Sequence, residues 1–150
     1  IEKPSKYIEP FIKAGADIVT IHVEVDDDIL GCLKKIKEMG KLSGLALNPD
    51  TDPERLRPYL EYTDMVLQMT VFPGFGGQSM VEDAIKNISV IRGMIGDKML
   101  EVDGGITSEN VHILTKEGAN VIVSGSGIFK YDDIADATVK LREKAVGGQK

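Results

Sequence analysis

The chain has 150 residues, of which 42% are hydrophobic and 28% are charged, so it can bury the core of a single domain over residues 1–150. Its formal net charge of −6 repels nucleic acid and anionic membranes, which excludes both as expected partners. The single cysteine, Cys32, excludes an intrachain disulfide and indicates a reducing, cytoplasmic location; in its apolar stretch we expect it to be buried.

In chain order, the sequence starts at Ile1 without Met or a signal peptide, which indicates a processed or truncated chain. Short apolar runs then alternate with longer amphipathic ones. The apolar runs are typical of parallel strands buried on both faces, and we expect strands at Ile18–Val23, Gly44–Leu47, Met65–Thr70, Met99–Val102 and Val121–Ser124. The amphipathic runs predict helices at Pro4–Ala14, Asp28–Met39, Pro53–Tyr62, Val81–Ile95, Ser108–Glu117 and Asp133–Lys144.

Turn and cap residues agree with these boundaries. Glycine marks the expected ends of three helices, at Gly15, Gly40 and Gly118. Asp52 before Pro53 is a typical helix start, and Thr107 or Ser108 can cap the helix that follows. The resulting α(βα)₅ order predicts an α/β fold with parallel strands.

Two architectures fit this order: an open, doubly wound sheet, or part of a (β/α)₈ barrel. A complete barrel usually needs about 250 residues, so length alone favours the open sheet. The glycine-rich loops favour the barrel instead, because they follow the last two strands. Paired phosphate-binding loops occupy that place in (β/α)₈ barrels.

These two loops are Asp103-Gly104-Gly105 and Ser124-Gly125-Ser126-Gly127. Glycine lets several backbone N–H groups point into one small volume, and helix N-termini after such loops add partial positive charge. Both features suit a phosphate group. A simple tight turn is the alternative for Ser124–Gly127.

A third loop, over residues 69–78, follows the third strand and combines glycines with two phenylalanines, Phe72 and Phe75. This composition predicts a lid that closes over a ligand with glycines as hinges; a structural turn is the alternative.

Several side chains are candidates for chemistry. Asp103 ends the fourth strand beside a proposed phosphate loop, so it can act as a general acid/base or metal ligand; a turn or N-cap aspartate is the alternative. His22 and Glu24 share one face of the first strand. They can form a metal-binding pair, or they can belong to a buried polar layer. Met69 can cover a planar intermediate, and Asn48 can line the site.

At this point the residues resemble ribulose-phosphate 3-epimerase. The resemblance extends over essentially all 150 residues and keeps the motif order. It rests on residues 20–24 and 44–49, on the Met-Thr-Val-Phe-Pro-Gly-Phe-Gly-Gly-Gln run at 69–78, and on residues 101–105 and 123–126.

This resemblance implies a (β/α)₈ barrel that interconverts ribulose 5-phosphate and xylulose 5-phosphate in the pentose phosphate pathway. Two aspartates and a divalent metal (Zn, Fe, Mn or Co) would transfer the carbon-3 proton. Asp103 would be one acid/base and a metal ligand, and Met69 a cap over the intermediate. The phosphate cradle and lid would comprise Gly74, Phe75, Gly76, Gly77, Gly104, Gly105, Gly125 and Ser126. His22 matches a strand histidine that is not a metal ligand.

The family places a serine, a His-x-Asp motif and another strand histidine ahead of the region present here. We therefore expect a barrel of about five βα units that lacks its first three strands, three metal ligands and the partner aspartate. Its open edges predict a homo-oligomer. The alternatives are a sibling epimerase acting on allulose or hexulose phosphate, and a phosphate-binding partial barrel without activity.

Overall fold

The fold is known from a computed structural model that describes residues 1–74 and 78–148. One sheet contains five parallel strands in the order β1-β2-β3-β4-β5. Their bounds are β1 Ile18–His22, β2 Leu42–Leu47, β3 Met65–Met69, β4 Met99–Asp103 and β5 Val121–Val123. All five strands lie within two residues of the predicted bounds.

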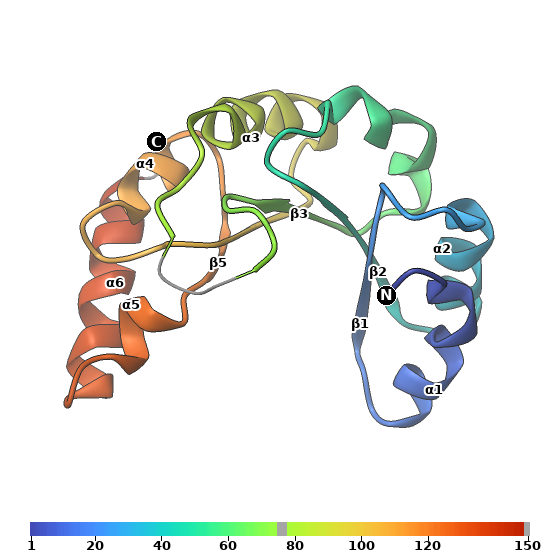
Figure 1. Cartoon of the computed structure of the whole chain (residues 1–150), viewed down its shortest axis with the longest axis horizontal. Helices are drawn as coiled ribbons and strands as arrows, with labels where there is room; N and C mark the ends of the chain where they lie inside the picture. Colours follow the sequence, from blue (N-terminus) through green and yellow to red (C-terminus); the bar gives the residue numbers. More distant parts are fainter. Residues whose placement is uncertain (75–77, 149–150) are drawn as a thin grey trace.

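The sheet curves into an arch, with the helices along its convex side (Figure 1). Each strand pairs with the next strand in the chain, so the winding never reverses as it does in a doubly wound sheet. This arrangement is that of a partial (β/α) barrel of about five units, and it confirms the α/β barrel prediction.

The helical segments match the prediction less closely than the strands do. They are η1 Pro4–Lys6, α1 Ile8–Lys13, α2 Ile29–Glu38, η2 Pro53–Tyr62, α3 Glu82–Ile95, α4 Val111–Lys116, α5 Ser126–Phe129 and α6 Ile134–Gly148. The glycines predicted to end helices all have positive φ: Gly15 at 110°, Gly40 at 73° and Gly118 at 114°. The predicted cap at Asp52 is confirmed, because its side chain accepts a hydrogen bond from the Glu54 amide.

The predicted α-helix at Pro53–Tyr62 is instead a 3₁₀-helix with Pro58 inside it. Proline has no N–H group and its ring collides with the carbonyl four residues earlier, so an α-helix is disfavoured here. The amphipathic pattern located the element but did not distinguish its type.

The helix predicted at Ser108–Glu117 begins only at Val111. Residues 107–110 form a turn first, in which the Asn110 side chain accepts from the Thr107 amide and Thr107 Oγ1 accepts from the Glu109 amide. The predicted cap residue Thr107 therefore closes this turn and not the helix. The short helix α5, which begins at Ser126, was not predicted.

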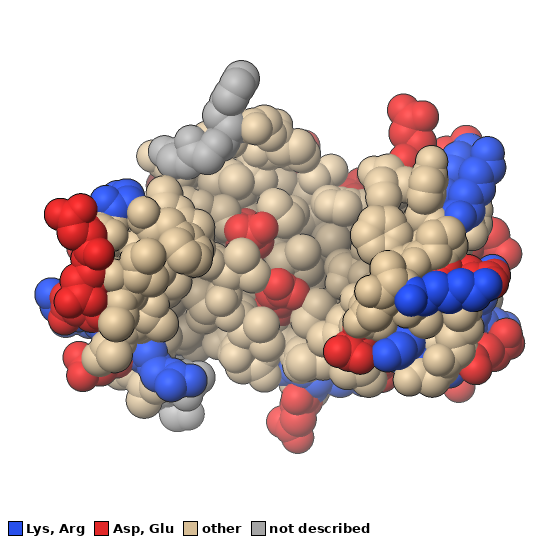
Figure 2. Space-filling view, turned by 90° about the horizontal axis from the view of Figure 1, so that it is seen from below, with Lys and Arg blue, Asp and Glu red and all other residues tan. Residues whose placement is uncertain are grey.

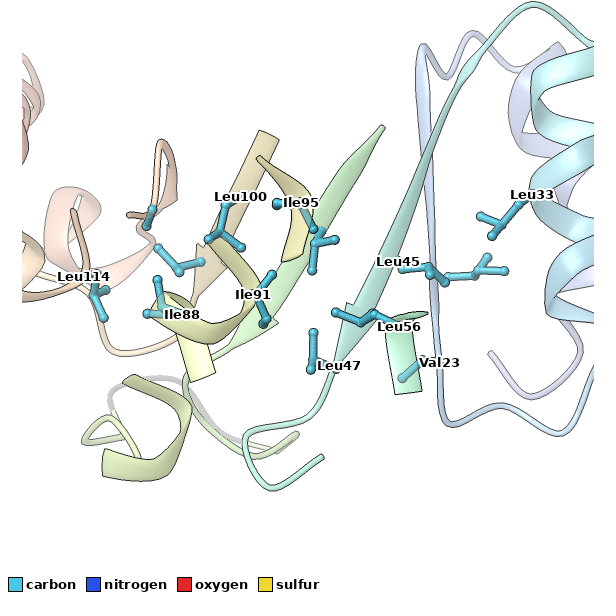
Figure 3. Packing of buried hydrophobic residues seen from close by; sticks show 14 of the residues in the cluster. Val23, Leu33, Leu45, Leu47, Leu56, Ile88, Ile91, Ile95, Leu100 and Leu114 are labelled. Carbon is cyan, nitrogen blue, oxygen red and sulfur yellow. The ribbon is translucent and has the colours of Figure 1, made fainter. Parts of the chain in front are cut away.

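The hydrophobic core lies between the sheet and the helices. Ile88 and Ile91 of α3 point toward Leu47 and Leu100 of the sheet (Figure 3), and all four side chains are fully buried. Cys32 is buried in the same core, as predicted.

The two edge strands, β1 and β5, each pair with one strand among the residues that the structure describes. Large apolar side chains near these edges are exposed, including Phe11 and Phe129. None of the described helices is both long and apolar enough to cross a bilayer.

Replacing Ile91 by Ala tests the assignment of the core to the convex side. The substitution leaves a cavity at a fully buried position, so we expect the free energy of unfolding to fall by about 2–5 kcal/mol in a urea titration. Val90 on the same helix is 49% exposed, and Val90→Ala should change it by less than about 0.5 kcal/mol. Equal losses for both variants would contradict the described packing.

Candidate functional site

The candidate site lies on the concave face, defined here as the face of the sheet opposite the helices. Because side chains alternate along a strand and paired residues point to the same side, the register gives the rows of this face. The top row contains Met69, Asp103 and Val123, and the second row contains His22, Ala46, Leu67, Glu101 and Val121. Figure 2 looks into this hollowed, mostly uncharged surface, with acidic side chains near its centre.

Asp103 ends β4 on this face and is half-buried. Burial raises the pKa of its carboxyl group. Burial, with the charge of Asp103, also raises the pKa of Glu101, one row below. A carboxylate that is partly removed from water binds a proton more strongly, so Asp103 is suited to accept and return protons.

Thr70 holds the backbone at Asp103. Its buried hydroxyl donates to the carbonyl oxygens of Asp103 (2.9 Å) and Gly104 (2.6 Å), and its amide donates to the Asp103 carbonyl (2.8 Å). Its own carbonyl accepts from the amide of Val81, at the start of α3. Thr70 thus ties β3, β4 and the entry to α3 together. Sequence reasoning missed this role, although Thr70 stands in the motif run.

The glycines after β4 are required by close packing. Gly104 has φ 124° and Gly105 has φ 63°. A Cβ at Gly104 would collide with Val71, and one at Gly105 would collide with the carbonyl oxygen of Gln78. The loop after β3 therefore lies directly against the loop after β4.

The loop after β5 lies beside the loop after β4 as well. Ser124 Oγ donates to the Ile106 carbonyl at 2.7 Å, and a Cβ at Gly127 would collide with that carbonyl. Gly125 and Ser126 are exposed at the start of α5. The structure thus brings together the two predicted phosphate loops.

The predicted lid is described only in part. Phe72 is exposed, Gly74 has φ 153°, and Gln78 Nε2 donates to the Phe72 carbonyl at 3.0 Å. The predicted site residues Phe75, Gly76 and Gly77 lie outside the described residues.

His22 and Glu24 form a hydrogen-bonded pair. His22 Nδ1 lies 2.9 Å from Glu24 Oε2, and the other carboxylate oxygen accepts from the Asn48 amide (2.8 Å) and Thr51 Oγ1 (2.5 Å). Although burial raises the pKa of Glu24, the hydrogen bonds from His22, Thr51 and Asn48 lower it to about 2. The ionised carboxylate therefore joins β1 to the end of β2. This network was not predicted, because its members are distant in sequence.

A cavity of about 1100 Å³ lies along the free edge of β1, next to α1 and residues 1–4. His22, Glu24 and Asn48 line it, together with Pro73 from the loop after β3. Asp103, on β4, is not among its lining residues.

No group of three or more His, Cys, Asp and Glu side chains within residues 1–74 and 78–148 is arranged to hold a metal ion. Asp103 offers one carboxylate. The residues that the structure describes therefore do not by themselves fit a metal centre, including one built on His22 and Glu24. His112 is exposed on α4.

Comparison with known proteins gives three related results. Residues 1–129 match the model of the ribulose-phosphate 3 epimerase family. Ribulose-phosphate 3-epimerase of Aquifex aeolicus is 40% identical over 95% of this chain, and the chloroplastic ribulose-5-phosphate-3-epimerase of Arabidopsis thaliana is 41% identical over 91%. The crystal structure of 3-hexulose-6-phosphate synthase from Salmonella typhimurium superposes with a TM-score of 0.74 over 96% of the chain, at 27% identity.

The chain spans only part of these proteins. It covers 66% of the Aquifex relative, 51% of the Arabidopsis relative and 68% of the Salmonella structure.

Replacing Glu24 by Gln tests the carboxylate network. A folded-state pKa of about 2, below the ordinary 4.5, means that Glu24 stabilises the fold above about pH 4.5 and loses this effect as the pH falls toward 2. We expect Glu24→Gln to lower the free energy of unfolding by about 2 kcal/mol at pH 7. In urea titrations, the difference in free energy of unfolding between the two proteins should be about equal at pH 7 and 5 and smaller at pH 3, and a constant difference would contradict the ionic role.

Replacing Gly105 by Ala tests the contact between the loops. The new Cβ meets the Gln78 carbonyl at a positive φ, so we expect a loss of stability of about 1–3 kcal/mol in urea unfolding. The matched control is Gly93→Ala within α3, where a Cβ meets open space. That change should stabilise the helix by about 0.5–1 kcal/mol. Changes of the same sign would count against the described loop packing.

Proposed function

The chain belongs to the ribulose-phosphate 3-epimerase family, and we propose that it carries the Asp103 proton-transfer group and the phosphate loops of an enzyme that interconverts ribulose 5-phosphate and xylulose 5-phosphate. The observation that carries this proposal is the position of Asp103. It lies at the carboxyl end of β4 beside two adjoining glycine loops, where parallel α/β enzymes place their active sites.

In the proposed reaction, Asp103 removes or returns the proton at carbon 3 of the sugar. Its partial burial supports this role, because the raised pKa of its carboxyl group favours proton uptake. Thr70 fixes the backbone from which this carboxylate projects. Met69 is paired with Asp103 in the top row and would exclude water from the reacting carbon.

The phosphate would bind where the loops after β4 and β5 adjoin, at Gly104, Gly105, Gly125 and Ser126. Glycine backbone leaves the amide groups unobstructed there. Gly74 and its neighbours in the loop after β3 would close over the same anion, since that loop packs against Gly105.

A divalent metal would supply charge stabilisation to the sugar oxygens when bound. Asp103 is the ligand that this chain would provide. A metal site with several protein ligands needs donors in addition to Asp103. The metal, and its identity as Zn, Fe, Mn or Co, therefore stays a prediction.

A sibling ketose-phosphate 3-epimerase, acting on allulose or hexulose phosphate, is the second candidate. The structural similarity to a 3-hexulose-6-phosphate synthase supports this second candidate. A cytoplasmic location and self-association through the open edges of β1 and β5 are further expectations from the sequence and the sheet.

Measuring exchange of the carbon-3 proton tests the function. We expect the gene product that contains these 150 residues, with added Mn²⁺ or Zn²⁺, to exchange the carbon-3 proton of ribulose 5-phosphate with D₂O. The exchange should be faster than in the same buffer without protein. Asp103→Asn should lower the rate by about 10²–10⁴, the usual contribution of a general acid/base.

Asp97 provides the matched control, because it is exposed and precedes β4 at the opposite end from Asp103. Asp97→Asn should retain the wild-type rate. Faster exchange with a six-carbon than with a five-carbon ketose phosphate would favour the sibling activity. Absence of exchange with either sugar would refute the proposal.

A further inference from the structure

His22 is held in one orientation by Glu24. The carboxylate is ionised and can only accept hydrogen bonds, so the proton of the neutral imidazole lies on Nδ1, 2.9 Å from Glu24 Oε2. Glu24 is fixed in turn by the Asn48 amide and the Thr51 hydroxyl. In that neutral tautomer the remaining ring nitrogen, Nε2, is an acceptor, and no described residue hydrogen-bonds to it.

The ring projects from the concave face into open space. The His22 side chain is 39% exposed, whereas that of Glu24 is 21% exposed. His22 shares the second row with Ala46. The cavity that His22 lines reaches Pro73, in the loop that packs against the predicted phosphate site.

This position faces Asp103 across the arch. Neighbouring parallel strands lie about 4.8 Å apart, so β1 and β4 are separated by about 14 Å along the sheet and by less across its concave side. A ligand whose phosphate binds at the loops after β4 and β5 extends over Asp103 and Met69 toward the ends of β2 and β1. The part of the ligand that arrives there is the end of the sugar remote from the phosphate.

The chemistry at His22 suits a hydroxyl group. A carboxylate-anchored imidazole also occurs at metal sites, but these need further donors, and no such group exists among the described side chains. A phosphate is disfavoured, because the negative charge of Glu24 lies next to the ring. A sugar hydroxyl can donate to Nε2 without adding charge.

We propose that His22, oriented by Glu24, is a sugar-binding residue whose Nε2 accepts a hydrogen bond from a hydroxyl at the end of the sugar remote from the phosphate. This inference rests on the proposed function and adds a binding residue on β1 to it.

Imidazole NMR of the gene product that contains these 150 residues tests the inference directly. Residues 1–150 contain two histidines, His22 and His112, and His112 is exposed on α4. The variants His22→Asn and His112→Asn assign the two sets of ring signals. Ribulose 5-phosphate should shift the His22 Nε2 signal and leave that of His112 unchanged. Inorganic phosphate should shift the amide signals of Gly105 and Gly125 but not His22.

Binding of the same two probes to variants gives an independent measurement. His22→Asn should raise the Kd for ribulose 5-phosphate roughly three- to tenfold, the loss of one hydrogen bond, and leave the Kd for inorganic phosphate unchanged. Glu24→Gln should weaken the binding of ribulose 5-phosphate less than His22→Asn does, because the imidazole itself is retained. His112→Asn should change neither Kd.

The outcomes separate the two proposals. If ribulose 5-phosphate shifts Gly105 and Gly125 but not His22, the role of His22 is refuted and the proposed function stands. If His22→Asn weakens the binding of ribulose 5-phosphate and of inorganic phosphate equally, the effect is structural and the inference fails. A His22 shift caused by Zn²⁺ alone would make it a metal ligand instead. If ribulose 5-phosphate shifts none of these signals, both proposals fail.

Discussion

Parallel pairing of each strand with its neighbour in the chain is the constraint on which this structure depends. A helical connection must return the chain to the start of the next strand, and right-handed crossovers place every connection on the same side of the sheet. One face is therefore covered by helices and the other is left concave (Figure 1). All strand ends with functional side chains consequently face one space, although Glu24 and Asp103 are far apart in sequence.

Within that frame, a few backbone contacts fix the site. The Thr70 hydroxyl and amide bind the carbonyls at the end of β4, and Gly105 allows the loop after β3 to lie against it. Ser124 joins the loop after β5 to Ile106. Movement of any one of these loops would disturb the others, so a lid closing over phosphate would be coupled to the backbone that carries Asp103.

The sequence predicted the strands well because parallel strands buried on both faces have continuous apolar runs, as at Gly44–Leu47. It also located three glycines that end helices, Gly15, Gly40 and Gly118, which all have positive φ, since few other residues adopt that conformation. The prediction of helices was wrong where another hydrogen-bonding pattern replaces that of the α-helix. Pro58 favours 3₁₀ geometry in η2, and Asn110 closes a turn before α4. The partners of Glu24 are 24 and 27 residues away, and no local pattern could identify them.

The charges of the concave face set a direction for an anionic ligand. The chain carries a net charge of −6, and Asp103 and Glu101 add negative charge to the floor of the arch. Interactions beyond about 8 Å are screened at physiological ionic strength, so local groups decide where a phosphate binds. Under the proposed function, the glycine backbone after β4 and β5 would attract the phosphate with its amide groups, whereas the ionised Glu24 would repel it at the β1 end. Under the same proposal, a sugar phosphate would satisfy both ends with its phosphate at the glycine loops and its uncharged hydroxyls toward β1. This orientation would carry the sugar chain across Asp103, as the proposed proton transfer at a single carbon requires.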